Sequence, residues 1–168
     1  MRKIYLLFVF CLLISAPLFS VSDTTPDKAT AQPGQYTPKG LPDMPLLTTA
    51  GIKTNAQELE GKVVLVLFQP DCDHCQREAV QIREHLQAFD DYTVYFITYA
   101  PMADIQRFAQ EYRLDGNKNI NFAYADVQPI LDNFGSVPTP SMYIYSDKRQ
   151  LVKAFEGETP ITEILQHI

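Results

Sequence analysis

Residues 63–75 read VVLVLFQPDCDHC. The first six, residues 63–68, form an unbroken apolar run rich in β-branched side chains, which is typical of a central strand covered on both faces. After Cys75 the sequence predicts a helix, because apolar residues recur at spacings of three and four: Ala79, Ile82, Leu86 and Phe89. Cys72 and Cys75 are therefore expected where a strand ends and a helix begins.

Strands and helices alternate downstream of this unit. The apolar patterns predict strands over residues 92–99, 121–124, 142–145 and 151–155, and helices over residues 103–114 and 127–134. Ile130, Leu131 and Phe134 are expected on the buried side of the second helix, and Pro160 is expected to open a last helix. We therefore expect an α/β domain with a mixed sheet that is mainly parallel and ends in an antiparallel hairpin.

The N-terminus has the outline of a secretory signal peptide. Arg2 and Lys3 precede an apolar run at residues 4–14, and the small residues at 20–22 fit a cleavage site. We therefore expect a signal peptide over residues 1–22, a flexible linker over 23–40 and one domain over 41–168. Export implies the periplasm or another oxidising compartment. The alternative is that residues 4–21 remain as a membrane anchor.

The charge of the chain argues against two classes of partner. The 168 residues carry a formal net charge of −6. Loss of residues 1–22 would remove Arg2 and Lys3 but no acid, and would leave 12 basic and 20 acidic residues. No run of Lys or Arg follows Lys3, so a surface for nucleic acid is not expected. Membrane contact is expected only if the N-terminal segment stays uncleaved.

The spacing of Cys72 and Cys75 favours redox chemistry. Two cysteines separated by two residues bring their sulfur atoms together when the first lies at a helix start and the second one turn further. The N–H groups and the dipole of the helix favour the Cys72 thiolate, which makes Cys72 the attacking sulfur and Cys75 the resolving one. His74 would stabilise this thiolate further, and the negative charge of Asp73 opposes it.

The sequence gives less support to three other roles of Cys72 and Cys75. A disulfide across so short a loop stabilises a fold little. A zinc or copper site would need further ligands, and the chain offers only His74, His85 and His167. Haem attachment needs a histidine directly after the second cysteine, where Gln76 stands. No metal and no other cofactor is therefore expected.

The order of strand, Cys-x-x-Cys and helix resembles the thioredoxin superfamily, and residues 134–145 resemble its second signature. In that family a loop residue and a cis proline precede a strand, and the loop faces the cysteine pair. The resemblance assigns these positions to Thr139 and Pro140 and implies that they bind the substrate. Pro138 is the rival for the cis position, but its use would leave Pro140 inside the strand.

Within the superfamily, the chain resembles the exported TlpA-like branch, which is related to the alkyl hydroperoxide reductases and redoxins. Residues 45–47 and 59–62 resemble the N-terminal strands of this branch and the lead-in to its central strand. The helix and strand between Tyr99 and Val127 match its customary insertion. Glu78 matches a glutamate that the branch uses in the proton balance of the site. The alternative for Glu78 is an ordinary exposed glutamate on a helix.

The chain also departs from the superfamily. Asp71 stands where a tryptophan usually precedes the first cysteine. Val66 replaces a buried acid of thioredoxins, which makes Glu78 the candidate proton acceptor for Cys75. The dipeptide between the cysteines is Asp-His instead of Gly-Pro, and strongly oxidising relatives share a histidine at this place.

Together these features predict an exported thiol-disulfide oxidoreductase that acts through Cys72 and Cys75, with reduction favoured over oxidation. Its partners would be protein disulfides or dithiols and a second protein that recycles the pair. A thiol peroxidase of the redoxin group is an alternative, although Leu65 and Gln69 replace the usual Pro and Thr of such enzymes. A copper-handling thioredoxin-like module is another alternative.

Overall fold

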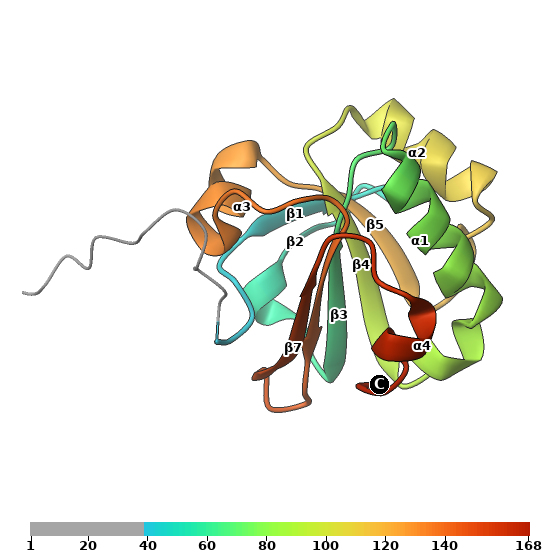
Figure 1. The fold of residues 1–168 in the computed structure, drawn as a ribbon. Helices are drawn as coiled ribbons and strands as arrows, with labels where there is room; N and C mark the ends of the chain where they lie inside the picture. The colour runs from blue at the N-terminus through green and yellow to red at the C-terminus, as the bar shows by residue number, and fades with distance from the viewer. Residues whose placement is uncertain (1–38) are drawn as a thin grey trace, which may run out of the picture. The chain divides into compact units, whose positions relative to one another are not determined.

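The computed structural model describes residues 39–168 (Figure 1). The signal peptide expected over residues 1–22, and all but the end of the linker expected over 23–40, lie outside the described residues. Within residues 39–168, no helix combines the length and the apolar character that crossing a membrane requires.

The described residues form one sheet of seven strands, in the order β2-β1-β5-β4-β3-β6-β7. The strands are β1 Pro45–Thr48, β2 Lys53–Asn55, β3 Lys62–Leu67, β4 Tyr92–Thr98, β5 Ile120–Tyr124, β6 Ser141–Tyr145 and β7 Leu151–Glu156. The helices are α1 Asp73–Glu84, α2 Met102–Glu111, α3 Val127–Phe134 and α4 Ile161–Ile164, with short 3-10 helices η1 Ala56–Glu58 and η2 Leu86–Phe89. The expected α/β domain with a mixed sheet is confirmed, as is the helix and strand insertion, which is α2 and β5.

The expectation of a mainly parallel sheet is wrong. Among the described strands, only the β3–β4 and β4–β5 pairs are parallel, and the other four pairs are antiparallel. After β3 and β4, the segments that contain α1 and α2 return the chain to the opposite end of the sheet before the next strand starts. The short α3 instead stays near the end of the sheet at which β5 finishes (Figure 1). The chain therefore enters β6 from that same end, with Ser141 opposite Leu67, and β6 runs antiparallel to β3.

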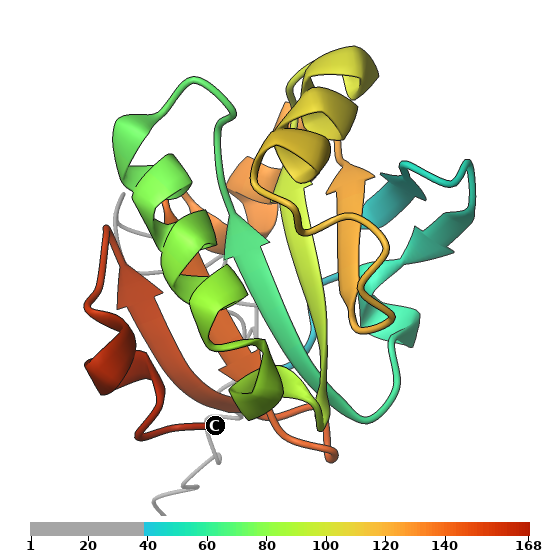
Figure 2. The ribbon, with the colours of Figure 1, turned by 90° about the vertical axis from the view of Figure 1, so that its right-hand side faces the viewer.

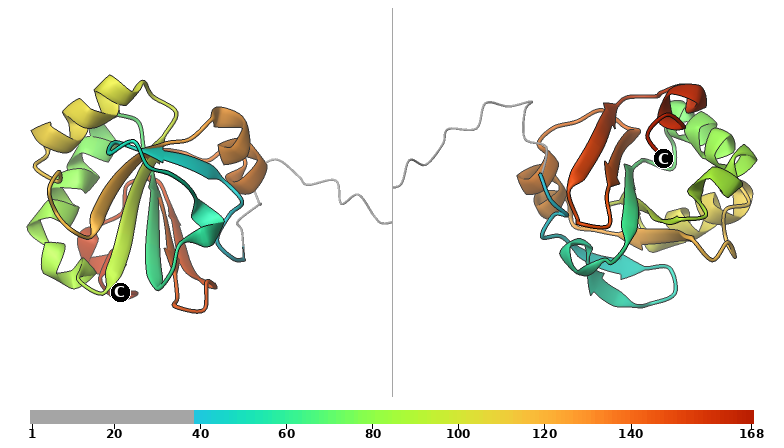
Figure 3. Two further views of the ribbon diagram at one scale, coloured as in Figure 1. Left: turned by 180° about the vertical axis from the view of Figure 1, so that it is seen from behind. Right: turned by 90° about the horizontal axis from the view of Figure 1, so that it is seen from below.

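The sheet separates two apolar cores. Helices α1, α2 and α4 contribute to one core, and Figure 2 looks onto the face that α1 and α2 cover. Helices η1 and α3 contribute to the other, on the opposite face (Figure 3). In β3, residues 63–67 are at most 3% exposed and alternate between the two cores. The prediction of a central strand covered on both faces is confirmed.

Two helices differ in detail from the sequence-based prediction. Helix α1 ends at Glu84, and Phe89 reaches the core from η2 instead of from the same helix. In α3, Ile130 and Phe134 are buried as predicted, but Leu131 is 43% exposed. A helix of two turns buries only a narrow stripe, and Leu131 lies about 100° around the axis from Ile130.

Candidate active site

Cys72 and Cys75 lie at the start of α1, just beyond the end of β3. Cys72 is the N-cap residue, with an extended backbone (φ −91°, ψ 114°), and its carbonyl accepts a hydrogen bond from Gln76 N–H at 3.0 Å. Cys72 Sγ accepts a hydrogen bond from Cys75 N–H at 3.4 Å. The N–H groups and the positive end of the dipole at a helix start stabilise a thiolate. Cys72 therefore has the setting of an attacking sulfur.

The loop before β6 faces Cys72. The Thr139–Pro140 peptide bond is cis, so the choice of Pro140 over Pro138 for the cis position is confirmed. The Cys72 thiol donates a hydrogen bond to the Thr139 carbonyl, with Sγ and O 3.4 Å apart. Gly157 N–H donates to the Pro140 carbonyl at 2.8 Å and so joins this loop to the end of β7. Segments from three parts of the chain therefore meet at the site.

The two cysteines are free thiols within the described part of the chain, and their environments differ. Cys72 is partly exposed, whereas Cys75 is only 2% exposed. The pKa of Cys75 is raised to about 12, first by burial and then by its hydrogen bond to Cys72, while a backbone hydrogen bond from Gln69 opposes the shift. Cys75 is thus a poor nucleophile until its proton is removed, which suits a thiol that acts second.

Glu78 lies one turn beyond Cys75 on the same side of α1. It is 1% exposed, so it is not the ordinary exposed glutamate that the sequence leaves open. Its Oε1 atom has no hydrogen-bond partner among the described residues. The pKa of Glu78 is raised to about 7, mainly by burial; the Thr159 backbone amide opposes the shift and the charge of Glu158 adds to it. Glu78 can therefore exchange a proton near neutral pH.

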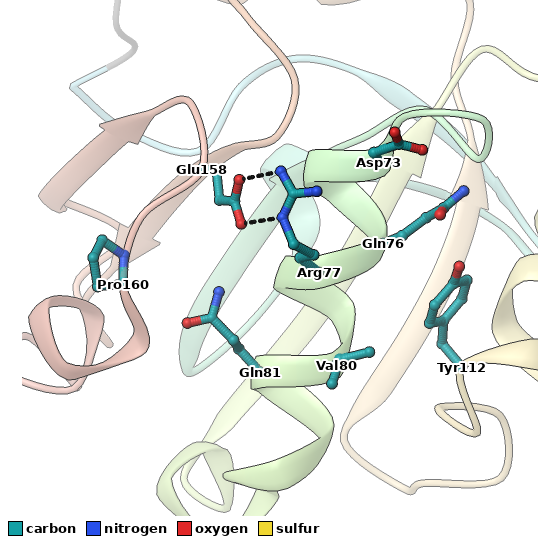
Figure 4. Close-up of a pocket in the computed structure, with 8 residues that line it drawn as sticks. All are labelled: Asp73, Gln76, Arg77, Val80, Gln81, Tyr112, Glu158 and Pro160. Atoms are coloured by element: carbon teal, nitrogen blue, oxygen red, sulfur yellow. Dashed lines mark hydrogen bonds and ion pairs between the residues drawn. The ribbon is translucent and has the colours of Figure 1, made fainter.

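His74 and Asp73 lie on the exposed first turn of α1, and His74 is bound to Glu158, with Nδ1 and Oε2 2.6 Å apart. Arg77 binds the same carboxylate through Nε at 2.8 Å and Nη2 at 2.7 Å (Figure 4). Neither Arg77 nor Glu158 is identified by the sequence pattern. The spacing of His74 and Arg77 is a usable signal, because side chains three apart are neighbours on a helix. Glu158 gives no such signal, since it comes from the loop after β7.

Three hollows lie near the pair among the described residues, and one of about 500 Å³ is lined by Gln69, Pro70 and Asp71. An open groove of about 800 Å³ runs beside α1 and is lined by Asp73, Gln76, Arg77, Val80, Gln81, Tyr112, Glu158 and Pro160 (Figure 4). A smaller hollow of about 230 Å³ adjoins Thr139, and three large exposed side chains contribute to it: Tyr99, Val127 and Leu131. Within residues 39–168, no group of three or more His, Cys, Asp or Glu side chains is arranged to hold a metal ion.

Known proteins resemble this chain in sequence pattern and in fold. The model of the AhpC/TSA family matches residues 39–154, and no curated protein matches the chain. Among solved structures, MTB dsbF has a TM-score of 0.63 at 18% identity, and the match covers 78% of this chain and 96% of that one. A secreted Mycobacterium tuberculosis disulfide oxidoreductase homologous to E. coli DsbE has a TM-score of 0.60 at 17% identity, over 74% and 93% of the two chains. Arabidopsis thaliana ScoI with copper bound has a TM-score of 0.61 at 13% identity, over 77% and 94%.

At these low sequence identities, the similarity to the solved structures shows that the fold is shared. The family match spans more than half of the chain and includes Cys72, Cys75 and Pro140. The chain therefore belongs to the AhpC/TSA family and has a thioredoxin-like fold, as the resemblance of its two sequence signatures predicts.

Proposed function

We propose that the protein is a thiol-disulfide oxidoreductase that exchanges disulfides with partner proteins through Cys72 and Cys75. The observation that carries this proposal is the position of Cys72 Sγ, which lies 3.4 Å from both the Cys75 backbone nitrogen and the Thr139 carbonyl oxygen. A sulfur atom in this position has a helix start to stabilise its thiolate and a cis-proline loop on which a substrate chain can lie.

In the first exchange, the Cys72 thiolate attacks one sulfur of a partner disulfide. A bond forms between Cys72 Sγ and that sulfur, and the S–S bond of the partner breaks. The second partner sulfur leaves as a thiolate and takes up a proton. The Cys75 N–H stabilises the attacking thiolate before this step. The product is a mixed disulfide between Cys72 and the partner.

In the second exchange, Cys75 attacks Cys72 Sγ and must first lose its proton. Glu78 is the proposed acceptor, because it is buried one turn away and has a free carboxyl oxygen. Part of the raised pKa of Cys75 comes from the hydrogen bond and charge of Cys72, and this part is lost once Cys72 is in a mixed disulfide. The Cys72–Cys75 bond then forms, the mixed disulfide breaks, and the partner leaves with two electrons and two protons gained.

The proposed substrate is an extended protein segment that carries a disulfide. The Thr139 backbone lies next to Cys72, and an extended chain can pair with such a backbone by strand addition. The adjoining hollow adds the apolar surface of Tyr99, Val127 and Leu131, which are 52%, 47% and 43% exposed. A segment with an apolar side chain beside its cysteine fits this surface.

We also propose that the pair acts as a reductant, that a second redox protein recycles it, and that the protein is exported. The pattern of residues 1–22 supports export, and one structurally similar protein is a secreted disulfide oxidoreductase. The reducing direction is supported by the carboxylate of Glu158, which binds Arg77 and His74 at the start of α1 and offsets positive charge there. This direction sends electrons from the pair to the partner.

Cysteine variants test the proposal. With an oxidised protein such as insulin as substrate, we expect Cys75→Ser to accumulate a mixed disulfide that dithiothreitol releases, and Cys72→Ser to form none. The double variant Cys72→Ser/Cys75→Ser is the control for adducts at other residues. Full insulin-reducing activity in Cys72→Ser, or no trapped substrate with Cys75→Ser, would refute the proposal.

A thiol peroxidase is a second candidate, because the family match allows it. At the two positions where such enzymes have Pro and Thr, Leu65 is fully buried and Gln69 accepts a hydrogen bond from the Thr98 hydroxyl at 3.2 Å. Neither of these two side chains carries a hydroxyl for a bound peroxide. Hydrogen peroxide consumption, measured with a recycling dithiol, would favour the peroxidase if it outpaced disulfide exchange.

Copper handling is a third candidate, which rests on the likeness to copper-bound ScoI. Cys72 and Cys75 would supply two ligands, and a third would have to come from outside the described site, since no three-ligand group exists within residues 39–168. One copper ion retained per chain after dialysis would support this candidate, and loss of the copper would exclude it.

A further inference from the structure

Glu158 gathers the two basic side chains at the start of α1. Its Oε1 atom accepts a hydrogen bond from Arg77 Nε at 2.8 Å, and its Oε2 atom accepts from Arg77 Nη2 at 2.7 Å and from His74 Nδ1 at 2.6 Å. Figure 4 shows the two bonds to Arg77. Glu158 directly follows Gly157, which is bonded to the carbonyl of Pro140. The carboxylate therefore connects the cis-proline loop to the helix that carries both cysteines.

The carboxylate of Glu158 accepts hydrogen bonds from both basic side chains. The hydrogen bonds from Arg77 and then from His74 lower the pKa of Glu158 to about 2, so its carboxylate is ionised near neutral pH and can only accept. In the contact with this carboxylate, His74 Nδ1 is the donor. Arg77 Nη2 lies 2.7 Å from the same Nδ1, but both atoms are then donors and form no hydrogen bond with each other.

Arg77 lies on α1 five residues after the N-cap residue Cys72, near the same end of the helix. The pKa of Arg77 is raised first by its hydrogen bond to Glu158, and the negative charges of Asp73 and Cys72 add to the shift. The same interaction works in reverse, because a nearby cation favours the thiolate form of Cys72. Glu158 holds its negative charge against the Arg77 guanidinium through two hydrogen bonds. It therefore weakens the effect of the Arg77 charge on Cys72 Sγ.

We propose that Glu158 is a positioning residue that keeps the Cys72–Cys75 pair reducing, by holding and neutralising Arg77 at the start of α1. The inference rests on the proposed function and deepens it. A dithiol whose reduced form is stabilised is a stronger oxidant. Glu158 removes one source of this stabilisation, the positive charge of Arg77, and the reduction potential of the pair is lower as a result.

The reduction potential tests this inference. Each purified protein is equilibrated with glutathione or dithiothreitol buffers, and the reduced fraction of the pair is measured by thiol alkylation and mass spectrometry. Glu158→Gln keeps an oxygen that accepts hydrogen bonds but loses the charge. We expect its equilibrium constant to shift at least about threefold towards the dithiol, or about 14 mV at about 29.6 mV per tenfold change. Arg77→Gln should shift the constant by a similar factor towards the disulfide.

Two further variants and a second readout separate electrostatics from damage to the fold. Glu84→Gln is the matched control, because Glu84 pairs with Arg83 at the far end of α1 and its removal should leave the potential unchanged. The double variant Glu158→Gln/Arg77→Gln should lie close to the wild type, since both charges are gone. The rate at which Cys72 is alkylated by iodoacetamide at neutral pH should rise in Glu158→Gln. A purely structural role would change the urea midpoint and leave both readouts unmoved.

The outcomes separate the inference from the proposed function. A wild-type pair that titrates, with the same potential in Glu158→Gln and Arg77→Gln, overturns the inference and leaves the proposed function intact. A shift of Glu158→Gln towards the disulfide overturns it in the same way. A wild-type pair that does not titrate in any buffer overturns both.

Discussion

Replacing Glu78 by glutamine should stabilise the protein above neutral pH. Glu78 is 1% exposed, and burial raises its pKa from 4.5 to about 7. Between these two values the folded state holds the proton and the unfolded state has lost it, so the free energy of unfolding falls as the pH rises through this window. A shift of this size corresponds to about 3 kcal/mol at about 1.4 kcal/mol per pKa unit. The full loss is present above the folded-state pKa and absent below the unfolded-state pKa.

Glutamine has no charge to bury, so Glu78→Gln should escape this loss. Urea unfolding near pH 4 should show little difference between the variant and the wild type, whereas near pH 8 the variant should be more stable by about 3 kcal/mol. Glu84→Gln is the matched control, because Glu84 is an exposed glutamate on the same helix and should give no such dependence on pH. A stability difference that does not widen between the two pH values would refute the burial argument.

The same variant should be slower in the second exchange. Loss of a general base typically lowers a rate by about 10²–10⁴-fold, so we expect the resolution of a mixed disulfide on Cys72 to slow by at least about a hundredfold. The assay follows release of a small aromatic thiol from a preformed adduct in a single turnover. Higher stability together with a slower second step would identify Glu78 as a group kept for function. Resolution at the wild-type rate would show that Glu78 does not accept the proton of Cys75.

Three further predictions concern the core and the substrate surface. Phe96→Ala should lower the free energy of unfolding by about 3–5 kcal/mol in urea, because its ring is 1% exposed and stacks on Phe122; a loss below about 1 kcal/mol would contradict this packing. Tyr145→Phe should raise stability by about 1–3 kcal/mol, because it removes a buried hydroxyl that has no hydrogen-bond partner among the described residues; a destabilised variant would show that this hydroxyl is bonded in solution. Leu131→Ser should change stability by less than about 0.5 kcal/mol but raise KM for a protein disulfide and not for a small disulfide; equal effects on both substrates would remove the hollow beside Thr139 from substrate binding.

The centre of the fold could be predicted because its signals are local. The run of residues 63–68 has no polar side chain and ends at a turn, so both its strand character and its burial follow from sequence alone. The cysteine spacing and the helical pattern after it place the pair at the start of α1. The assignment of Pro140 to the cis position rests on the resemblance of a short segment to a known signature. Local physics alone does not supply this assignment.

The remaining features depend on contacts between distant parts of the chain. The direction of β6 follows from how far α3 travels along the sheet, and an apolar pattern carries no such information. Glu78 lies on the buried side of α1, but a charged residue at a helical position is most often exposed. Glu158 reaches His74 from 84 positions away in the chain. The pairing of β7 with β6, together with the hydrogen bond from Gly157 N–H to the Pro140 carbonyl, brings this carboxylate to the start of α1.

The position of β6 implies an order in which the working parts of the site are made. β6 lies beside β3 in the interior of the sheet, although it is one of the last strands in the chain. A chain growing from its N-terminus thus carries Cys72 and Cys75 well before it carries Thr139, Pro140 and Glu158. During this interval the thiols are present without the loop that faces them or the carboxylate that holds Arg77. A chain that stops before β6 would therefore have both thiols but lack the loop that faces them. Selectivity for a partner is thus acquired later in synthesis than the thiols themselves.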